Sequence, residues 1–349
     1  MRMKLRGIAN AVPLVLWLAL AGCASSRTGA FPAVVGGQVE AASEPWTFEG
    51  RSGLLLKTPA FRIFTTMPPG STLDRIPPFL EAALEHYTTA VGELPRPRSA
   101  METYVMRRRE QWASLTQRVM GDEANTYLRI QRGGFTARGK AVLFYIGPRD
   151  TFAIAAHEGW HQYTQTVFRE ALPIWLEEGL ATYMEGFRWD RDDPRVVRFM
   201  PWANTERYDA LREAAEEGRL VPLARLLASV PQDLMSRQAE DALQYYAQVW
   251  ALTQFLGEGE GGKYRDALHG MVRDAAEGRL TRRVSRERGS RAASAFTSSR
   301  RGADALLAFT GGELSQLEAE YSRFVGEIVR VGNKQRIVAG QSPISAGAR

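Results

Sequence analysis

Residues 157–161, His-Glu-Gly-Trp-His, constrain the fold of this 349-residue chain more than any other segment. Histidines at i and i+4 face one point only on a helix, where their Cβ atoms lie about 5–6 Å apart. The flanking sequence predicts a helix, because Asp150 can cap its start and an apolar run over residues 151–156 follows. A tetrahedral Zn²⁺ with Zn–N distances of about 2.0–2.1 Å fits between the imidazoles of His157 and His161. Glu158 is then placed to act on a zinc-bound water as a general base.

The spacing is specific because histidine is rare in this chain, which contains four. At the observed frequencies, chance gives about 0.003 copies of His-Glu-x-x-His in a chain of this length. The alternative, a helix with two surface histidines, is therefore disfavoured. His86 and His269 are isolated, and each is expected to be a packed or surface histidine rather than a ligand.

A second helix is predicted to supply the third ligand. Pro173 favours a helix start, and residues 174–185 continue with apolar side chains available for burial. Glu178, Thr182 and Glu185 recur at i, i+4 and i+7 on one face of this helix. Glu178 is the predicted ligand, and the other two are polar groups that could hold the free N–H of a ligand imidazole. Without the histidine motif, adjacent glutamates here would indicate a solvated acidic pair.

These motifs resemble those of the gluzincin zinc metallopeptidases, the clan that includes thermolysin-like and aminopeptidase N-like enzymes. The second motif of the aminopeptidase N-like branch reads Trp-Leu-Asn-Glu-Gly-Phe-Ala, and residues 175–181 here read Trp-Leu-Glu-Glu-Gly-Leu-Ala. The alignment puts Glu178 at the ligand position and Glu177 in place of the family's Asn. The resemblance covers residues 150–187 and 245–256.

The third part of the resemblance is the run Tyr-Ala-Gln-Val-Trp-Ala-Leu over residues 246–252, which is similar to a downstream helix of those enzymes. A tyrosine opens that helix and stabilises the oxyanion, so the resemblance gives this role to Tyr246, with Tyr245 as a rival. Fixed donors aimed at developing charge can contribute several kcal/mol to catalysis. The alternative is that both tyrosines belong to the buried stripe of a core helix, and the sequence leaves both readings open.

The resemblance implies one Zn²⁺ per chain, bound by His157, His161 and Glu178, and hydrolysis of a peptide bond in a protein or peptide substrate. The loop between the two motifs is shorter than in the aminopeptidases, since 16 residues separate His161 from Glu178. No Gly-Ala-Met-Glu-Asn-like segment, which grips a free substrate amine in that family, is present. The sequence therefore gives no indication of aminopeptidase specificity, and the chain is more similar to small gluzincin-like peptidases of bacterial envelopes.

The N-terminus resembles a bacterial lipoprotein signal. Three basic residues precede an apolar run over residues 8–21, which is too short to span a membrane comfortably. The run ends in Leu-Ala-Gly-Cys, which is similar to a lipobox, so residues 1–22 are expected to be removed and Cys23 to carry acyl chains. The alternative is an ordinary cleaved signal with a chance cysteine. The expected location is the bacterial cell envelope, lipid-anchored at the outer membrane if the host has two membranes.

The charge balance does not indicate nucleic-acid binding. The formal net charge is +6, and removal of the three basic residues of the signal segment leaves +3. Eight arginines concentrate between residues 279 and 301, interleaved with Ser, Gly and Ala. This stretch is predicted to be a solvated or disordered loop, with attraction to anionic lipid headgroups or cell-wall polymers as the functional alternative.

The mature chain is predicted to divide into four parts. These are a flexible tether at residues 23–45, an α/β subdomain at 46–149, a helical catalytic subdomain with the zinc site at 150–330, and a disordered tail at 331–349. The predicted fold class is α+β and zincin-like, with a small mixed sheet packed on the helical subdomain and the metal site between them. Strands are expected at residues 52–58, 61–66, 101–106, 125–131 and 140–147, helices at 74–92, 107–120 and 314–328, and a loop near 189–201.

An edge strand lies above the metal in the zincin fold and pairs with extended substrate. Two segments are candidates for this strand. Residues 140–147 end just before the predicted zinc helix, and residues 133–135 belong to a hairpin region that precedes it.

Two other functions remain open on the sequence. A zinc-bound lipoprotein without turnover would act as an envelope scaffold or binding protein, but the intact Glu158 argues against it because only catalysis needs that residue. A periplasmic binding module with an accidental motif would require three separate matches to be coincidence.

Overall fold

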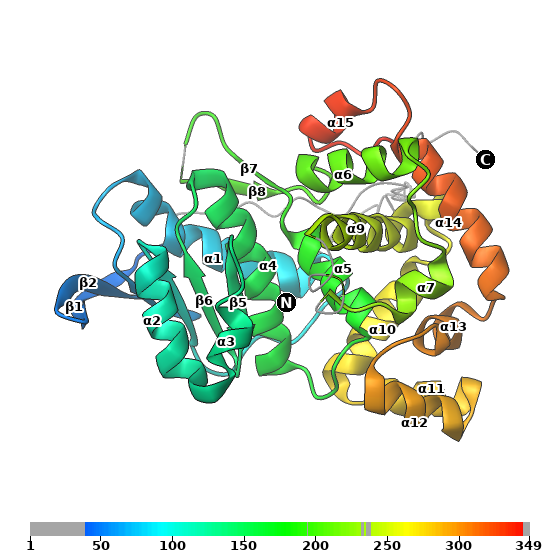
Figure 1. Cartoon of the computed structure of the whole chain (residues 1–349), viewed down its shortest axis with the longest axis horizontal. Helices are drawn as coiled ribbons and strands as arrows, with labels where there is room; N and C mark the ends of the chain where they lie inside the picture. The colour runs from blue at the N-terminus through cyan, green and yellow to red at the C-terminus, as the bar shows by residue number, and fades with distance from the viewer. Residues whose placement is uncertain (1–38, 194, 232–233, 235–238, 345–349) are drawn as a thin grey trace, which may run out of the picture.

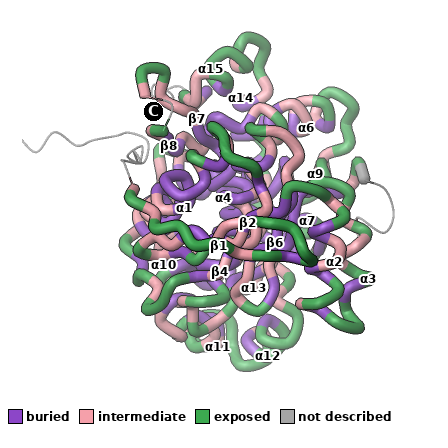
Figure 2. The backbone as a smooth tube through the Cα atoms, turned by 90° about the vertical axis from the view of Figure 1, so that its left-hand side faces the viewer, coloured by how far each residue is buried: buried purple, intermediate pink, exposed green. Residues whose placement is uncertain are grey.

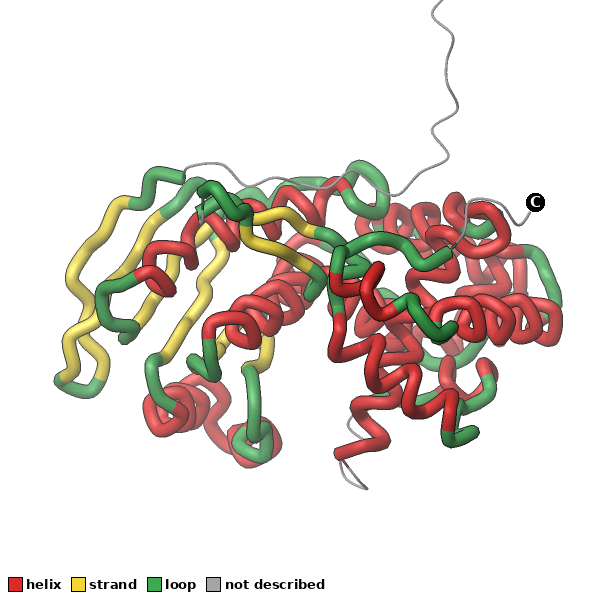
Figure 3. The backbone as a smooth tube through the Cα atoms, turned by 90° about the horizontal axis from the view of Figure 1, so that it is seen from above, coloured by secondary structure: helices red, strands yellow, loops and turns green. Residues whose placement is uncertain are grey.

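The structure is a computed structural model that describes residues 39–193, 195–231, 234 and 239–344. A six-stranded sheet with its covering helices lies beside a second group made almost entirely of helices (Figure 1). Seen from above, the strands gather on one side of the molecule and the later helices on the other (Figure 3). The fold class is therefore α+β, as predicted. The predicted signal segment and Cys23 lie outside the described residues.

The sheet has the strand order β1-β2-β3-β4-β6-β5. Its members are β1 (Ala42–Phe48), β2 (Arg51–Lys57), β3 (Phe61–Thr65), β4 (Met101–Met106), β5 (Gly134–Ala137) and β6 (Lys140–Phe144). β3, β4 and β6 run parallel, whereas β2 is antiparallel to β3 and β5 is antiparallel to β6. Within the described part of the chain, β5 therefore forms one edge of the sheet and β1 the other.

Helices cover both faces of the sheet. α2 (Arg109–Met120) packs on one face, and α1 (Ser71–Thr89) and α4 (Pro148–Val167) pack on the other. Val142 and Leu143, neighbours in β6, are fully buried in the two different cores, because successive side chains of a strand point to opposite faces. A strand buried on both faces reads as a continuous apolar run, which explains the sequence Ala-Val-Leu-Phe at residues 141–144.

The helical group is built around α9 (Ala239–Gly262), on which α5 (Ile174–Met184), α6 (Thr205–Glu216) and α14 (Leu314–Ile328) pack. One hydrophobic core runs from Leu56 in the sheet to Ile337 near the C-terminus and joins the two groups. Buried segments accordingly lie in the middle of the molecule, with exposed ones around them (Figure 2). The remaining elements are η1 (Gly121–Glu123), α3 (Ala124–Tyr127), β7 (Phe187–Trp189), β8 (Val197–Phe199), α7 (Leu223–Ala228), α10 (Arg265–Glu277), α11 (Leu280–Arg288), α12 (Ser290–Ser299), α13 (Asp304–Thr310) and α15 (Lys334–Val338).

Several predictions for the sheet region are wrong. The strand expected at residues 125–131 is helix α3 followed by a turn. The expected tether at 23–45 overlaps β1, whose residues pair with β2 from Ala42 onward. The loop expected near residues 189–201 connects β7 to β8, so that prediction fails only for the paired residues Trp189 and Val197–Phe199. These segments are short, so their apolar residues gave no periodicity that could separate a strand from a helix or a loop.

Two predictions for the C-terminal region are also wrong. The arginine-rich stretch at 279–301 forms α11 and α12 rather than a disordered loop, because Leu280 and Val284 lie one turn apart and are fully buried. The expected tail at 331–349 contains α15, where Ile337 is fully buried in the core. In both places a few apolar residues among many polar ones decide the structure. No helix in the described ranges has the length and apolar content needed to cross a bilayer.

Candidate metal centre

Helix α4 carries His157, Glu158 and His161. It begins at Pro148, a first-turn position where the missing N–H of proline costs no hydrogen bond. Asp150 does not cap this helix as expected; it lies in the first turn and pairs with Arg132 at 2.5 Å. The predicted helix is nevertheless present, and both histidines lie on the face that meets α5.

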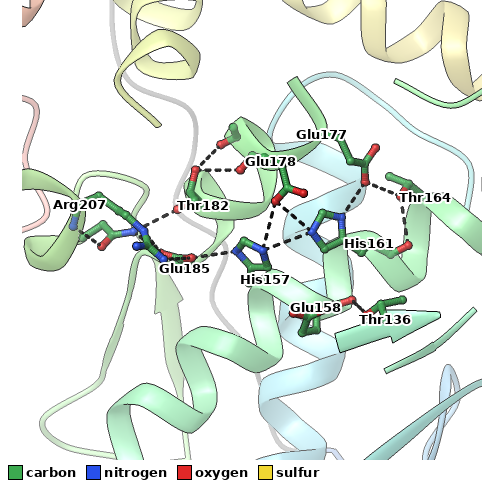
Figure 4. Close-up of polar contacts among 12 residues, drawn as sticks. Thr136, His157, Glu158, His161, Thr164, Glu177, Glu178, Thr182, Glu185 and Arg207 are labelled. Atoms are coloured by element: carbon green, nitrogen blue, oxygen red, sulfur yellow. Dashed lines mark hydrogen bonds and ion pairs between the residues drawn. The ribbon is translucent and has the colours of Figure 1, made fainter. Parts of the chain in front are cut away.

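Three donor atoms converge where α4 meets α5 (Figure 4). The Nε2 atoms of His157 and His161 are 3.2 Å apart, and Oε2 of Glu178 lies 3.6 Å and 3.5 Å from them. Ligand atoms at about 2.0–2.2 Å from a tetrahedral zinc would lie roughly 3.3–3.6 Å from one another. Oε2 of Glu178 is buried and has no hydrogen-bond partner within the described residues. The residues therefore fit a metal ion, which would satisfy that oxygen and both imidazoles.

A second carboxylate orients each imidazole. Nδ1 of His157 lies 2.9 Å from Oε1 of Glu185, and Nδ1 of His161 lies 3.0 Å from Oε1 of Glu177. A carboxylate at Nδ1 keeps the proton on that nitrogen, so the lone pair of Nε2 faces the site. Glu177 also accepts a hydrogen bond from the Thr164 hydroxyl at 2.7 Å. Both rings are thus fixed in the tautomer that a metal ligand needs.

The structure corrects one orienting residue and adds another. Glu185 lies against His157, at the place the sequence indicated. Thr182 was expected to hold an imidazole and does not, because its short side chain donates to the carbonyls of Glu178 and Gly179 in its own helix. Glu177 holds the other imidazole instead, and it is buried rather than solvated. One sign of this role was present in the sequence: Glu177 aligns with the Asn of the aminopeptidase N-like motif, directly before the predicted ligand Glu178.

Two further residues, Arg207 and Asn204, complete the polar surroundings of the site. The Arg207 guanidinium donates to both carboxylate oxygens of Glu185, at 2.9 and 3.0 Å, and Asn204 donates to one of them at 2.7 Å. Both residues belong to the start of α6, about twenty positions beyond α5. The sequence offers no spacing pattern that connects them to the histidines.

The charges in this site favour a cation. Burial lowers the pKa of His157, but the neighbouring carboxylates of Glu178 and Glu185 outweigh burial and raise this pKa to about 9. Burial also lowers the pKa of His161, but the charge of Glu178 and the hydrogen bond that the ring donates to Glu177 hold this pKa well above its usual range. Burial raises the pKa of Glu178, yet the neighbouring histidines keep it far below its usual value. Without a metal, these carboxylates therefore keep both imidazoles protonated. A divalent cation would displace the protons from Nε2 of each ring.

Both candidate tyrosines lie near Glu178. The Tyr246 ring is half-buried and meets the His157 ring edge-to-face, with centroids 5.9 Å apart. Tyr245 is buried, and its hydroxyl has no hydrogen-bond partner in the described part of the chain. Burial and then the charge of Glu178 raise the pKa of both phenols, so both stay protonated and able to donate. Tyr246 packs against the same core as Tyr245 but is the more exposed of the two tyrosines.

Glu158 is partly exposed beside the two histidines. Its backbone carbonyl accepts a hydrogen bond from the Thr136 hydroxyl of β5 at 2.8 Å, which ties the edge strand to α4 (Figure 4). Its carboxylate has neither a hydrogen bond nor an ion pair with any residue that the structure describes. This carboxylate is therefore available to a water or a ligand.

Glycines in both motifs allow close helix packing. A Cβ at Gly159 would lie 2.5 Å from the Tyr87 hydroxyl of α1, and one at Gly179 would lie 2.4 Å from the Thr253 hydroxyl of α9. These contacts hold α4 against α1, and α5 against α9. His86, outside the site, is fully buried against Phe199, as expected for a packed histidine, and burial lowers its pKa to about 3.

Comparison with known proteins gives one match. A family model described as "Protein of unknown function (DUF1570)" matches residues 151–278. No curated protein and no solved structure matches the chain significantly. The matched segment runs from the first turn of α4 to the end of α10, and it contains His157, Glu158, His161, Glu178 and Tyr246. The chain is thus similar to that family over the segment that builds the candidate metal centre.

Proposed function

We propose that this chain is a zinc-dependent peptidase of the gluzincin type, in which His157, His161 and Glu178 hold one Zn²⁺. The observation that carries the proposal is the convergence of three donor atoms 3.2–3.6 Å apart, one of them a buried oxygen with no hydrogen-bond partner within the described residues. Each imidazole also has its own orienting carboxylate, as metal-binding histidines usually do. A helix with two surface histidines would have none of these features.

Glu158 is the proposed general base. Zinc bound at this site would polarise a carbonyl group and lower the pKa of a bound water toward about 7. The Glu158 carboxylate, free of partners in the described structure, would take a proton from the attacking water and return it to the leaving amine. A purely structural zinc site has no use for such a carboxylate, so its freedom favours catalysis over a scaffold role.

Tyr246 is the proposed donor to the carbonyl oxygen as negative charge develops there. Its ring lies beside His157, and its raised pKa keeps the hydroxyl protonated. Loss of one such donor typically lowers kcat about 100- to 1,000-fold. Tyr245 is less suited because only 2% of its surface is exposed.

Strand β5 is the proposed docking edge for an extended substrate. Of the two segments that the sequence offered, residues 140–147 are excluded because β6 lies between β4 and β5. Strand β5 (Gly134–Ala137) forms the edge itself, packs beside α4, and is bonded to it through Thr136. Backbone groups along an open edge can pair with a peptide of many different sequences. An edge strand beside the histidine helix is also what a zincin-like fold would require, so this placement supports the proposal.

The test compares the parent protein with Glu158→Gln and with a control, Glu110→Gln, at an exposed position on α2. All three are expected to bind about one zinc per chain, because Glu158 is not a ligand. Cleavage of an unstructured protein should fall about 100- to 10,000-fold in Glu158→Gln alone. Zinc binding by all three without cleavage by any of them would favour the scaffold, and absence of zinc from the parent would end the proposal.

A further inference from the structure

Arg207 is a buried cation that the proposed chemistry does not yet use. Its side chain is 12% exposed, and its Nε and Nη2 donate to the two oxygens of Glu185 at 3.0 and 2.9 Å. Asn204, at the N-cap of α6, accepts from the Arg207 backbone N–H and donates to Glu185 at 2.7 Å. The first turn of α6 therefore fixes the carboxylate that orients His157.

The same guanidinium reaches the proposed oxyanion donor. The Cζ atom of Arg207 lies 5.2 Å from the centre of the Tyr246 ring, within range of a cation–π interaction. One planar guanidinium therefore contacts both the carboxylate that orients His157 and the ring of Tyr246. Figure 4 shows Arg207 next to Glu185, in line with His157 and Glu178.

Net stability does not explain this arrangement. Removing an arginine and a glutamate from water is costly, and apolar side chains of the same volume often serve a core equally well. The pair instead supplies geometry, because the guanidinium fork binds a carboxylate with two parallel hydrogen bonds in a fixed plane.

We infer that Arg207 is a positioning residue that couples the orientation of His157, through Glu185, to the placement of Tyr246. This inference rests on the proposed function, since it gives Arg207 a task only if the site binds zinc. Lysine cannot replace it fully, because an ammonium group has neither the fork nor the planar face.

The test measures the zinc dissociation constant, the visible spectrum of the Co²⁺-loaded protein, and kcat and KM. Arg207→Met removes charge and fork, Arg207→Lys keeps the charge, and Arg212→Met is the control. Arg212 belongs to the same helix but forms an exposed i,i+4 pair with Glu216. Arg207→Met should raise the dissociation constant for zinc about 10- to 100-fold, change the Co²⁺ spectrum, and lower kcat more than it raises KM. Arg207→Lys should recover most of the zinc affinity but not kcat, and Arg212→Met should match the parent.

A double variant separates coupling from general damage. In a Glu185→Gln background, Arg207→Met should weaken zinc binding less than about 3-fold, because its path to His157 is already broken. A folded Arg207→Met with parental zinc affinity and Co²⁺ spectrum would overturn the inference, as would a full additive loss in the double variant. If Arg207→Met does not fold, parental kcat and Co²⁺ spectrum in Arg207→Lys would overturn it equally.

The outcomes also separate this inference from the proposed function. A parent that binds zinc without cleaving any substrate refutes the peptidase, while zinc affinity and the Co²⁺ spectrum still judge Arg207. A parent that binds neither zinc nor Co²⁺ refutes both.

Discussion

Two regions of this molecule are rich in charge and use it differently. In the candidate metal centre, the side chains of Glu177, Glu178 and Glu185 are no more than 13% exposed, and each lies against an imidazole. At α11, which we call the outer end, a surface pocket of about 300 Å³ is lined by Arg279, Arg282, Arg283 and Arg286. The side chains of Arg279, Arg283 and Arg286 are 37–63% exposed. Their ion pairs join mostly residues close in sequence, such as Arg286 and Glu287. Charges withdrawn from water fix geometry, whereas charges in water contribute little because solvent and salt screen them.

The largest expected difference between the two regions is in how their charges affect zinc affinity as the pH changes. The pKa of His157 is raised to about 9, so below that pH the metal-free site holds a proton that zinc must displace. For the metal-free protein, the stability that this proton contributes is complete below about pH 6.5 and is lost as pH rises through about 9. Zinc affinity has the opposite pH dependence: it should rise about tenfold per pH unit over this range for each proton displaced.

Competition with a chelating dye at a series of pH values would measure this slope. A zinc affinity that stayed constant between pH 6.5 and 8.5 would contradict the assigned coupling between imidazoles and carboxylates.

The next largest effect is expected on the free energy of unfolding, when a methyl group is added at a closely packed glycine rather than at an open one. Gly179→Ala places a Cβ against the backbone carbonyl of Val249 and the Thr253 hydroxyl, so α5 and α9 must move apart. We expect a loss of about 2–3 kcal/mol in the free energy of unfolding, and weaker zinc binding because Glu178 moves with α5. Gly326→Ala on α14 is the matched control, since its Cβ meets nothing within 4 Å. It should stabilise the protein by up to about 1 kcal/mol.

Urea unfolding of both glycine variants measures this difference. Equal effects at the two positions would mean that α5 and α9 are packed less closely than the structure shows.

The smallest effect is expected at the outer end. Arg286→Gln removes an exposed ion pair with Glu287, and the free energy of unfolding should change by less than about 0.5 kcal/mol, with no change in zinc affinity. Repeating the measurement at high salt should reduce even that difference. A loss above about 1 kcal/mol would show that the comparison is mistaken and that these arginines support the fold.

The sequence predicted those parts of the site that share a helix. His157, His161, Glu178 and Glu185 follow the spacing of helix turns, and the structure brings them together. Arg207 and Asn204 could not be predicted, because their contact with Glu185 depends on how α6 packs across the molecule. The lipoprotein signal with Cys23 stays a prediction, since it lies outside the described residues.

The elements of the fold also divide into those that the sequence predicted and those that it missed. Strong periodic patterns gave α1, α2, α5 and α14 at close to their observed bounds, and the predicted strand at residues 101–106 coincides with β4. The arginine-rich α11 and α12 were missed because two buried residues per helix are too few to reveal a period. Strand β1 was missed because six of its seven residues are not buried, so no apolar alternation marks it.

The position of the ligands in the chain has a consequence for biosynthesis. Both histidines, Glu178 and both orienting carboxylates lie within residues 157–185, on two consecutive helices joined by a short loop. Closing so short a loop costs little entropy, and such local contacts form early in folding. A growing chain would therefore expose a nearly complete ligand set before α6 and α9 are synthesised. If the site binds zinc as proposed, the ion can bind before those helices pack, and Arg207 would then complete the site around it.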